Sequence, residues 1–255
     1  MAILTLTRAW TRLEEQTTIH VILPNEIQSD RKLQVLWLLH GLGDNGSGFI
    51  RKTNLEVLTK YTNLAVITPE MNRSFYMNLH NGLPYWDYLT KQVMPEMRKL
   101  LPLSSDRQDN FVGGTSMGGF GALKLAFTHP EWFSAVMLMS PVVDLSELPA
   151  MMPDAQDAQG ILDGIAPEHY LETLAEQSPS EQLRQLRFFY CIGDQDELKP
   201  TNDRFVQYMR NDLKLPVDYH TGAGGHDWLY WQRMLPEMLT WLLKVNLADG
   251  QPLES

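Results

Sequence analysis

Hydrophobic positions along the chain fall into short runs separated by longer segments of helical period. Seven runs of β-branched, aliphatic and aromatic residues have the length and composition of strands. Three longer segments repeat apolar residues every three or four positions, as an amphipathic helix does. The predicted strands are Ile19–Leu23, Leu33–Leu39, Leu64–Thr68, Asn110–Gly113, Ala135–Met139, Leu186–Ile192 and Val217–His220, and the predicted helices are Tyr85–Leu100, Met117–Phe127 and Trp228–Leu243.

This alternation predicts an α/β fold with a mostly parallel central sheet and helices on both faces. The run Val35–Leu39 is apolar at every position, which is typical of a central strand covered from both sides. A length of 255 residues is ordinary for one such domain, and the sequence contains no internal repeat. We therefore expect a single domain over residues 1–255.

Residues 144–180 depart from this rhythm. The segment contains four prolines, a Met151-Met152 pair and scattered acidic residues. Long insertions in compact domains are often lids or binding loops. We expect a cap or lid insertion that forms one wall of a substrate site. The alternative is a surface excursion that carries one short helix near residues 168–176.

Charge and composition exclude several classes of partner. The net charge is −10 and no run of Lys or Arg occurs, which argues against nucleic acid or an anionic membrane. No apolar stretch approaches the roughly 20 residues of a membrane helix, and the apolar residues before Arg8 are too few for a signal peptide. A cytoplasmic location is the resulting expectation.

The single cysteine, Cys191, lies in an apolar run and is expected in the core. The oligomeric state stays open, a homo-oligomer included.

The strongest chemical signal is Gly114-Thr115-Ser116-Met117-Gly118, between a predicted strand and a predicted helix. Glycines two positions before and after the serine allow the sharp strand-to-helix turn that exposes a nucleophilic hydroxyl. This glycine pattern alone occurs by chance in about one chain in ten of this length, so the strand–turn–helix context carries the argument. It predicts Ser116 as a nucleophile.

A serine nucleophile needs a histidine base and a carboxylate that orients it, and in this fold they follow in the order Ser, acid, His. His226 lies in a glycine-rich loop before the last predicted helix and is the predicted base. His220 ends a predicted strand and is expected to be structural. Asp194 and Asp196 both follow the strand that ends at Ile192, and their spacing does not separate them.

Two backbone N–H groups are needed to stabilise the oxyanion of acyl transfer. The predicted donors are Met117, which follows the nucleophile, and Leu42, in the segment Leu39-His40-Gly41-Leu42-Gly43. The histidines are scattered and no nucleotide-binding glycine loop is present, so we expect neither a metal nor a cofactor.

The sequence resembles the putative-esterase family of α/β-hydrolases, which contains tributyrin-type esterases and, more distantly, S-formylglutathione hydrolase (esterase D). The resemblance covers nearly the whole chain and is most specific in Gly114–Ala122 and Gly225–Trp228. It implies an α/β-hydrolase fold. It also implies that the acid is the fourth residue of a G-x-x-D stretch, which selects Asp196 over Asp194.

The resulting hypothesis is a serine carboxylesterase that hydrolyses short-chain acyl esters of small molecules through an acyl-enzyme. Short acyl chains are what the tributyrin-type relatives imply. Trp86, Met151 and Met152 are candidates for the wall of an acyl pocket, although core packing explains them equally well. The alternatives are an S-formylglutathione thioesterase, a carbohydrate acetyl or feruloyl esterase, and, from another class, a catalytically silent binding module.

Overall fold

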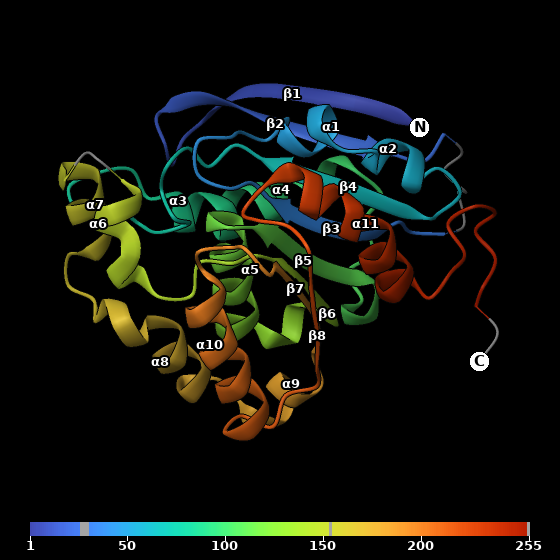
Figure 1. The fold of residues 1–255 in the computed structure, drawn as a ribbon. Helices are drawn as coiled ribbons and strands as arrows, with labels where there is room; N and C mark the ends of the chain where they lie inside the picture. The colour runs from blue at the N-terminus through green and yellow to red at the C-terminus, as the bar shows by residue number, and fades with distance from the viewer. Residues whose placement is uncertain (26–30, 153–154, 254–255) are drawn as a thin grey trace.

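The computed structural model describes residues 1–25, 31–152 and 155–253, which contain an eight-stranded sheet flanked by helices (Figure 1). The sheet order is β1-β2-β4-β3-β5-β6-β7-β8. The strands are β1 (Ala2–Trp10), β2 (Glu15–Leu23), β3 (Gln34–Leu39), β4 (Leu64–Pro69), β5 (Asn110–Thr115), β6 (Ala135–Met139), β7 (Arg187–Gly193) and β8 (Val217–Gly222). All seven predicted strands are confirmed, with ends that shift by a few residues.

The strands from β4 to β8 in sheet order are parallel, whereas β1 and β2 run antiparallel to their neighbours. Parallel strands present their carboxyl ends at one edge, and ligands of open α/β sheets bind outside that edge. In this sheet Thr115 pairs with Met139, and Met139 pairs with Cys191, so the loops that follow β5, β6 and β7 begin side by side.

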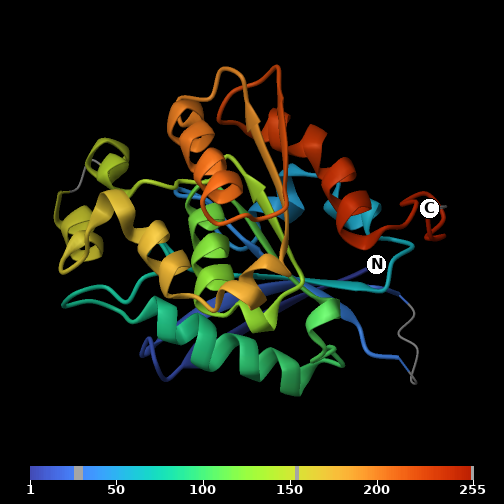
Figure 2. The same ribbon diagram turned by 90° about the horizontal axis from the view of Figure 1, so that it is seen from below.

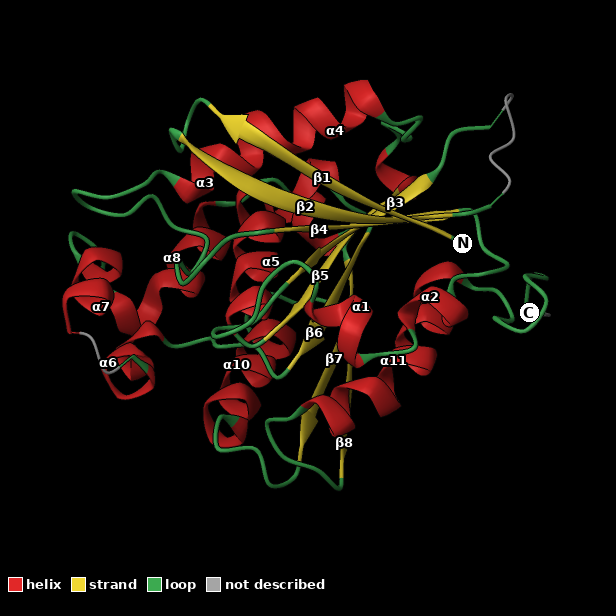
Figure 3. Ribbon diagram, turned by 90° about the horizontal axis from the view of Figure 1, so that it is seen from above, coloured by secondary structure: helices red, strands yellow, loops and turns green. Residues whose placement is uncertain are grey.

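Two apolar layers hold the helices on the sheet, one on each face. Because successive side chains of a strand point to opposite faces, Val35 and Trp37 belong to one layer and Leu36 and Leu38 to the other. Figures 2 and 3 show α5 and α10 on one face and α1, α2 and α11 on the opposite face. These helices are α1 (Gly48–Lys52), α2 (Leu55–Leu58), α5 (Met117–Thr128), α10 (Lys199–Asn211) and α11 (Trp228–Leu243). The predicted α/β-hydrolase class, with helices on both faces, is confirmed.

Strand β1 was not predicted from the sequence. It forms the edge of the sheet, and Trp10 is its only fully buried residue. Ile3 and Leu4 are 42% and 43% exposed, so the strand lacks the alternation of buried and exposed apolar residues that marks a half-buried strand. Strand β1 is instead stabilised by its antiparallel pairing with β2, which runs from Ala2 opposite Leu23 to Trp10 opposite Glu15.

The predicted helix Tyr85–Leu100 is present but is not uniform. It comprises α3 (Tyr85–Tyr88), a π-helical segment η1 (Leu89–Val93) and α4 (Met94–Leu100). Pro95 stands just after the π segment. A proline has no N–H for the carbonyl four residues earlier and its ring clashes with that carbonyl, so the wider turn accommodates it.

Residues 144–180 form short helices rather than an extended loop. They are η4 (Leu145–Glu147), α6 (Leu148–Met151), α7 (Ala155–Leu162), η5 (Pro167–His169) and α8 (Tyr170–Gln177), and α9 (Ser180–Arg184) follows. Pro153 and Asp154 lie outside the described residues. The segment is anchored at two points: Tyr170 of α8 stacks on Phe120 of α5, and His80 N–H donates to Gly160 of α7.

The sequence analysis also predicted a buried cysteine and no membrane-spanning helix. Cys191 is fully buried, and its burial raises the pKa of the thiol. Across the described ranges, every helix is too short or too polar to cross a bilayer.

Glycines allow α5 to begin directly against the sheet. A Cβ on Gly118 would lie 2.0 Å from the carbonyl oxygen of Leu39 at the end of β3, and a Cβ on Gly114 would lie 2.4 Å from the Gly118 carbonyl carbon. Real Cβ atoms do not approach backbone atoms so closely. The first turn of α5 therefore contacts the ends of β3 and β5 backbone to backbone, and the turn at Ser116 depends on this contact.

We expect Gly118→Ala to destabilise the protein by about 3 kcal/mol, because the added methyl group must separate α5 from β3. Gly160→Ala is the matched control. Gly160 is also helical, but a Cβ at this position would lie at an ordinary contact distance, 3.7 Å from His80 O. Alanine favours a helix over glycine by about 1 kcal/mol, so the control should be neutral or stabilising. Urea unfolding of both variants measures the difference, and equal stabilities would contradict the backbone contact.

Candidate active site

Ser116 occupies the turn between β5 and α5 in a conformation that is unusual for a residue with a side chain. Its φ is 53° and its ψ is −119°. Its backbone is held by three hydrogen bonds: Ser116 N–H donates to Met139 O at 3.0 Å, and Ser116 O accepts from Phe120 at 3.1 Å and Val142 at 3.1 Å. Strain of this kind persists only where surrounding contacts impose it, and it is common at catalytic residues. The turn presents the hydroxyl at the carboxyl edge of the sheet.

His226 and Asp196 meet Ser116 from two other loops. His226 Nε2 lies 2.9 Å from Ser116 Oγ. On the other side of the ring, Nδ1 lies 3.0 Å from Asp196 Oδ2 and 3.2 Å from Oδ1. A serine, an imidazole and a carboxylate in this order and at these distances match the geometry of an acyl-transfer triad. The structure therefore brings together the three residues that the sequence analysis selected.

The loops that carry Asp196 and His226 are fixed to one another. Asp194 N–H donates to Gly222 O at 2.8 Å, and Gln195 N–H donates to Gly224 O at 2.9 Å. A Cβ on Gly193 would lie 2.2 Å from Gly224 O, so only glycine allows this approach. Asp227 then caps α11 through hydrogen bonds from Leu229 and Tyr230 N–H. His226 therefore stands between a fixed loop and a fixed helix.

Asp196 is a buried carboxylate, and its residue is 4% exposed. Burial raises its pKa. The hydrogen bonds from His226, Ser140 and the N–H of Leu198, together with the charge of His226, lower the pKa by more than this, so it lies below that of an ordinary aspartate. Asp196 is therefore ionised at neutral pH. The carboxylate is suited to holding the Nδ1–H tautomer of His226 and the imidazolium that forms during acyl transfer.

Ser140 supports this carboxylate and was missed by the sequence analysis. Its hydroxyl accepts a hydrogen bond from Trp231 Nε1 at 3.0 Å, which leaves its own proton for Asp196. Trp231 also packs edge-on against the His226 ring, with 5.1 Å between the ring centroids. Neither residue belongs to a recognisable motif. Ser140 directly follows β6, which pairs with the strand before Asp196, whereas Trp231 reaches the site from α11.

The neighbouring candidates lie elsewhere. Asp194 is exposed, and its side chain has no hydrogen bond among those of the described residues. His220 stacks on Phe189, with 4.2 Å between centroids, and lies 3.4 Å from Glu237. These contacts match the structural role expected of His220. Of the two aspartates, Asp196 is the one that lies beside His226.

The two predicted oxyanion donors belong to adjoining backbone segments. Met117 is the first residue of α5, so its N–H has no partner in the helical ladder. Gly41, which precedes Leu42, packs on the nucleophile: a Cβ there would lie 3.4 Å from Ser116 Cβ. In the described part of the chain, Leu42 N–H donates to no backbone carbonyl.

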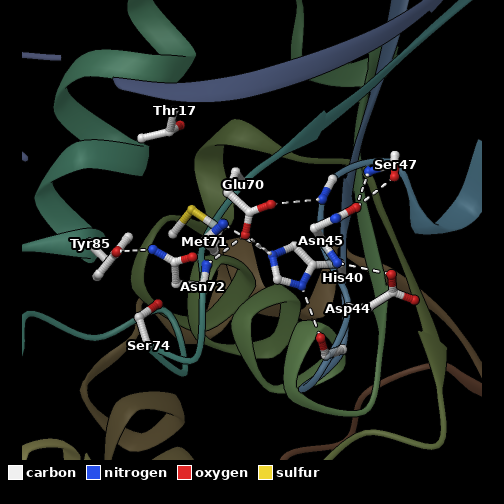
Figure 4. A network of polar contacts seen from close by, with 12 residues as sticks. Thr17, His40, Asp44, Asn45, Ser47, Glu70, Met71, Asn72, Ser74 and Tyr85 are labelled. Atoms are coloured by element: carbon white, nitrogen blue, oxygen red, sulfur yellow. Dashed lines mark hydrogen bonds and ion pairs between the residues drawn. The ribbon is translucent and has the colours of Figure 1, made fainter. Parts of the chain in front are cut away.

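His40 fixes the orientation of the peptide that carries the Leu42 N–H (Figure 4). The His40 Nδ1–H group donates to Gly41 O at 2.9 Å, and Nε2 accepts from Met71 N–H at 3.0 Å. In a trans peptide the N–H points opposite to the C=O. Because the imidazole holds the Gly41 carbonyl on its own side, the Leu42 N–H is directed to the other side.

Glu70 and Tyr76 complete this support, and the sequence analysis missed both. Glu70 accepts hydrogen bonds from the N–H groups of Gly46 and Asn72 and lies 3.3 Å from His40 Nε2. Burial raises the pKa of Glu70, but His40 and the two N–H donors lower it more. Tyr76 OH donates to His40 O at 2.9 Å. The segment Leu39–Gly43, called the oxyanion segment below because it carries the predicted donor Leu42, is therefore fixed by hydrogen bonds to both its side-chain and its backbone atoms.

The three predicted substrate-binding residues have other surroundings. Trp86 lies with its ring centroid 4.2 Å from Lys124 Nζ, about two helical turns of α5 beyond Ser116. Met152 is 1% exposed within the core, and Met151 packs against the same apolar cluster from a partly exposed position. Met151 and Met152 therefore pack with the core, and Trp86 packs against Lys124.

Two cavities flank the carboxyl edge of the sheet near these loops. One, of about 320 Å³, is mainly apolar and is lined by Asn72, Leu79, Leu83, Tyr85 and Ile161, with Arg73 and Ser74. The other, of about 750 Å³, is called the acidic cavity because its lining includes four carboxylates, those of Asp144, Glu168, Glu172 and Glu176, beside Arg204 and His169. Both include residues of 144–180. Among the described residues no group of three or more His, Cys, Asp or Glu side chains is placed to bind a metal.

Comparison with known proteins shows the family to which the chain belongs. The model of the family described as "Putative esterase" matches residues 11–242. The chain belongs to the putative-esterase family. Its triad-like site and its fold are therefore those of a serine ester hydrolase.

The similarity to known proteins covers almost the whole of this esterase. An acetyl esterase of Caldicellulosiruptor saccharolyticus is 25% identical over 96% of this chain and 100% of its own length. Two solved structures from Staphylococcus aureus are each 29% identical and cover 94% of this chain and 98% of their own. They are the fluorophosphonate-binding serine hydrolase FphF, with a TM-score of 0.86, and the S-formylglutathione hydrolase FrmB, with a TM-score of 0.84.

We expect Asp196→Asn to lower kcat by about 10⁴, because an amide neither selects the same imidazole tautomer nor stabilises the imidazolium. Asp194→Asn, two residues away on the same loop, is the matched control and should change kcat less than about threefold. Steady-state hydrolysis of p-nitrophenyl acetate by both variants measures this ranking. A larger loss in the Asp194 variant would reverse the assignment.

Proposed function

We propose that this esterase hydrolyses short-chain acyl esters with Ser116 as nucleophile, His226 as general base and Asp196 as the orienting acid. The observation that carries the proposal is the 2.9 Å approach of His226 Nε2 to Ser116 Oγ, with Asp196 on the other ring nitrogen. Ser116 Oγ attacks the ester carbonyl as its proton passes to Nε2. The imidazolium then protonates the departing alcohol oxygen.

In the second half-reaction a water molecule takes the place of the alcohol. His226 removes a proton from this water, which attacks the acyl-serine, and Ser116 recovers its proton as the carboxylic acid leaves. In both halves the N–H groups of Leu42 and Met117 stabilise the negative charge on the carbonyl oxygen. The hydrogen bonds of His40 and Tyr76 to the oxyanion segment hold the Leu42 donor in place before substrate arrives.

A short acyl group is supported by the small apolar cavity and by the similarity to an acetyl esterase. Asn72 in the cavity lining follows Met71, whose N–H donates to His40 Nε2. Ile161 of α7 contributes to its wall. The segment 144–180 would then act as the predicted cap, with acyl length limited on this side.

The alcohol part of the substrate is proposed to face the acidic cavity. Val143 and Asp144 line it, and they follow Val142, whose N–H donates to Ser116 O. Its four carboxylates against one arginine favour a leaving group that carries hydroxyl groups or positive charge over one that carries carboxylates, such as glutathione. This charge favours acetyl esters of polyhydroxylated alcohols over the S-formylglutathione alternative.

The test is hydrolysis of p-nitrophenyl esters from C2 to C12, acetylated sugars and S-formylglutathione by the wild type and Ser116→Ala. We expect the highest kcat/KM for C2 to C4 esters, with acetylated sugars preferred over S-formylglutathione. Ser116→Ala should lower kcat by about 10⁴ to 10⁶ and leave the thermal unfolding curve unchanged. Retained activity in the variant would refute the nucleophile, whereas a preference for S-formylglutathione would refute only the leaving-group assignment.

The role of the segment 144–180 in chain-length selection is tested at Ile161, the residue of this segment in the lining of the apolar cavity. Ile161→Ala should raise kcat/KM for C8 relative to C2 esters by about tenfold, since an apolar wall discriminates by about 1–3 kcal/mol per methylene. Met234→Ala, a partly buried methionine of α11 on the opposite face, is the control. If both variants keep the wild-type ratio, the segment covers the surface without selecting substrates.

A further inference from the structure

Lys124 is a buried lysine that the esterase mechanism does not use. It lies on α5, eight residues after Ser116 and so about 12 Å further along the helix, and it is 5% exposed. Its Nζ donates to Tyr76 O at 2.9 Å and contacts Met77 Sδ. The faces of two aromatic rings complete its surroundings, with Trp86 at 4.2 Å and Tyr170 at 5.8 Å.

No carboxylate of the described residues lies within ion-pair distance of this amine. Asp87, on α3, acts on Lys124 only from farther away, and it is itself paired with Lys91 and Arg12. The other titratable groups near Lys124 are the phenols of Tyr170 and Tyr76, whose pKa values burial raises, and His129, which stacks on Trp86. At neutral pH both phenols are uncharged. A charged ammonium at this place is therefore desolvated without a counter-ion.

Desolvation by burial accordingly lowers the pKa of Lys124 to about 7, and the charge of Asp87 offsets only part of the change. Near neutral pH a substantial fraction of Lys124 is therefore the free amine. An ordinary exposed lysine, with a pKa near 10.4, is neutral in only about one molecule in 10³ to 10⁴. A desolvated lysine amine of this kind is a nucleophile toward carbonyl compounds.

Lys124 also lines a space that a small molecule can occupy. A cavity of about 290 Å³ is lined by Lys124 and, around it, by Met77, Asn78, Trp86, Thr128, Tyr170 and Leu174. Thioether, leucine and aromatic side chains dominate this lining. The cavity therefore suits a small apolar compound rather than a charged one.

We propose that Lys124 is the reactive amine of a second site, separate from Ser116, that captures small apolar aldehydes as an imine. The amine nitrogen attacks the aldehyde carbon and loses one of its two protons, while the carbonyl oxygen gains one, which gives a neutral carbinolamine. The carbinolamine loses its hydroxyl group with a second proton as one water molecule, and a C=N bond forms. The step needs no oxidant or reductant, and water reverses it.

The proposal is tested by trapping the imine with cyanoborohydride. The wild type and Ser116→Ala are each exposed briefly to propanal at pH 7 with the reductant, and peptide mass spectrometry locates the alkylated lysines. We expect Lys124 to be modified about tenfold faster than any of the other eight lysines, in both proteins. Because the signal does not depend on Ser116, failure of the esterase proposal would leave it unchanged.

The pH profile separates a reactive amine from a structural one. Between pH 5.5 and 9, modification of Lys124 should rise to a plateau just above pH 7. Modification of Lys99, whose side chain is 71% exposed, should keep rising about tenfold per pH unit. If Lys124 instead stays unmodified while Lys99 reacts, the amine only anchors the Tyr76 carbonyl and the proposal is overturned.

Variants at position 124 supply the control. Lys124→Arg keeps the charge and cannot form an imine, so the label at this position should vanish while labelling of Lys99 persists. Lys124→Met tests the titration itself. The unfolded chain binds a proton between pH 7 and 10.5 that folded Lys124 releases, so wild-type stability rises with pH in this window and the Met variant should lack that contribution. An unchanged pH dependence of stability would contradict a neutral Lys124.

Discussion

The close backbone contact between the first turn of α5 and the ends of β3 and β5 is the constraint on which the site depends. Without side chains at Gly114 and Gly118, the helix begins directly above the sheet. The first turn of α5, where the proposed donor Met117 lies, is then close to the Gly41–Leu42 peptide, because Gly41 packs on Ser116. Because donors that are fixed in advance cost no reorganisation during reaction, rigid packing here serves electrostatic stabilisation.

The acid and base are positioned by a second contact of the same kind, between the loops after β7 and β8. Gly193 approaches Gly224 at a distance that excludes any side chain. Hydrogen bonds from Asp194 and Gln195 N–H join the two loops. Asp196 and His226 are thirty residues apart in sequence, and these backbone contacts hold together the two loops that carry them. Substitutions on the outer surfaces of these loops should therefore leave the pair intact.

Much of the fold follows from local patterns. The seven apolar strand runs and the strand–turn–helix at Ser116 are readable because burial on both faces leaves little choice of residue. Strand β1 was not readable, since pairing with β2 rather than an apolar pattern forms it. The π segment before Pro95 shows how one proline alters a helix whose periodicity is otherwise regular.

The site divides in the same way. Ser116 and His226 stand in short motifs, and the family register selected Asp196. Ser140, Glu70 and Tyr76 could not be found, because they act through contacts between segments that are distant in sequence. Trp86 and Met152 were plausible pocket residues from composition alone. The structure places one beside Lys124 and the other in the core, because side-chain direction depends on how helices pack.

The insertion between β6 and β7 leaves and rejoins the sheet at two neighbouring strands. Met139 and Cys191 are paired across that boundary, and Ser140 N–H donates to Cys191 O. The path of the chain beyond Asp144 can therefore lengthen, shorten or be exchanged without moving either strand. Under the proposed role of this segment in substrate selection, evolution can vary substrate choice independently of the chemical step, by replacing a single contiguous piece of chain.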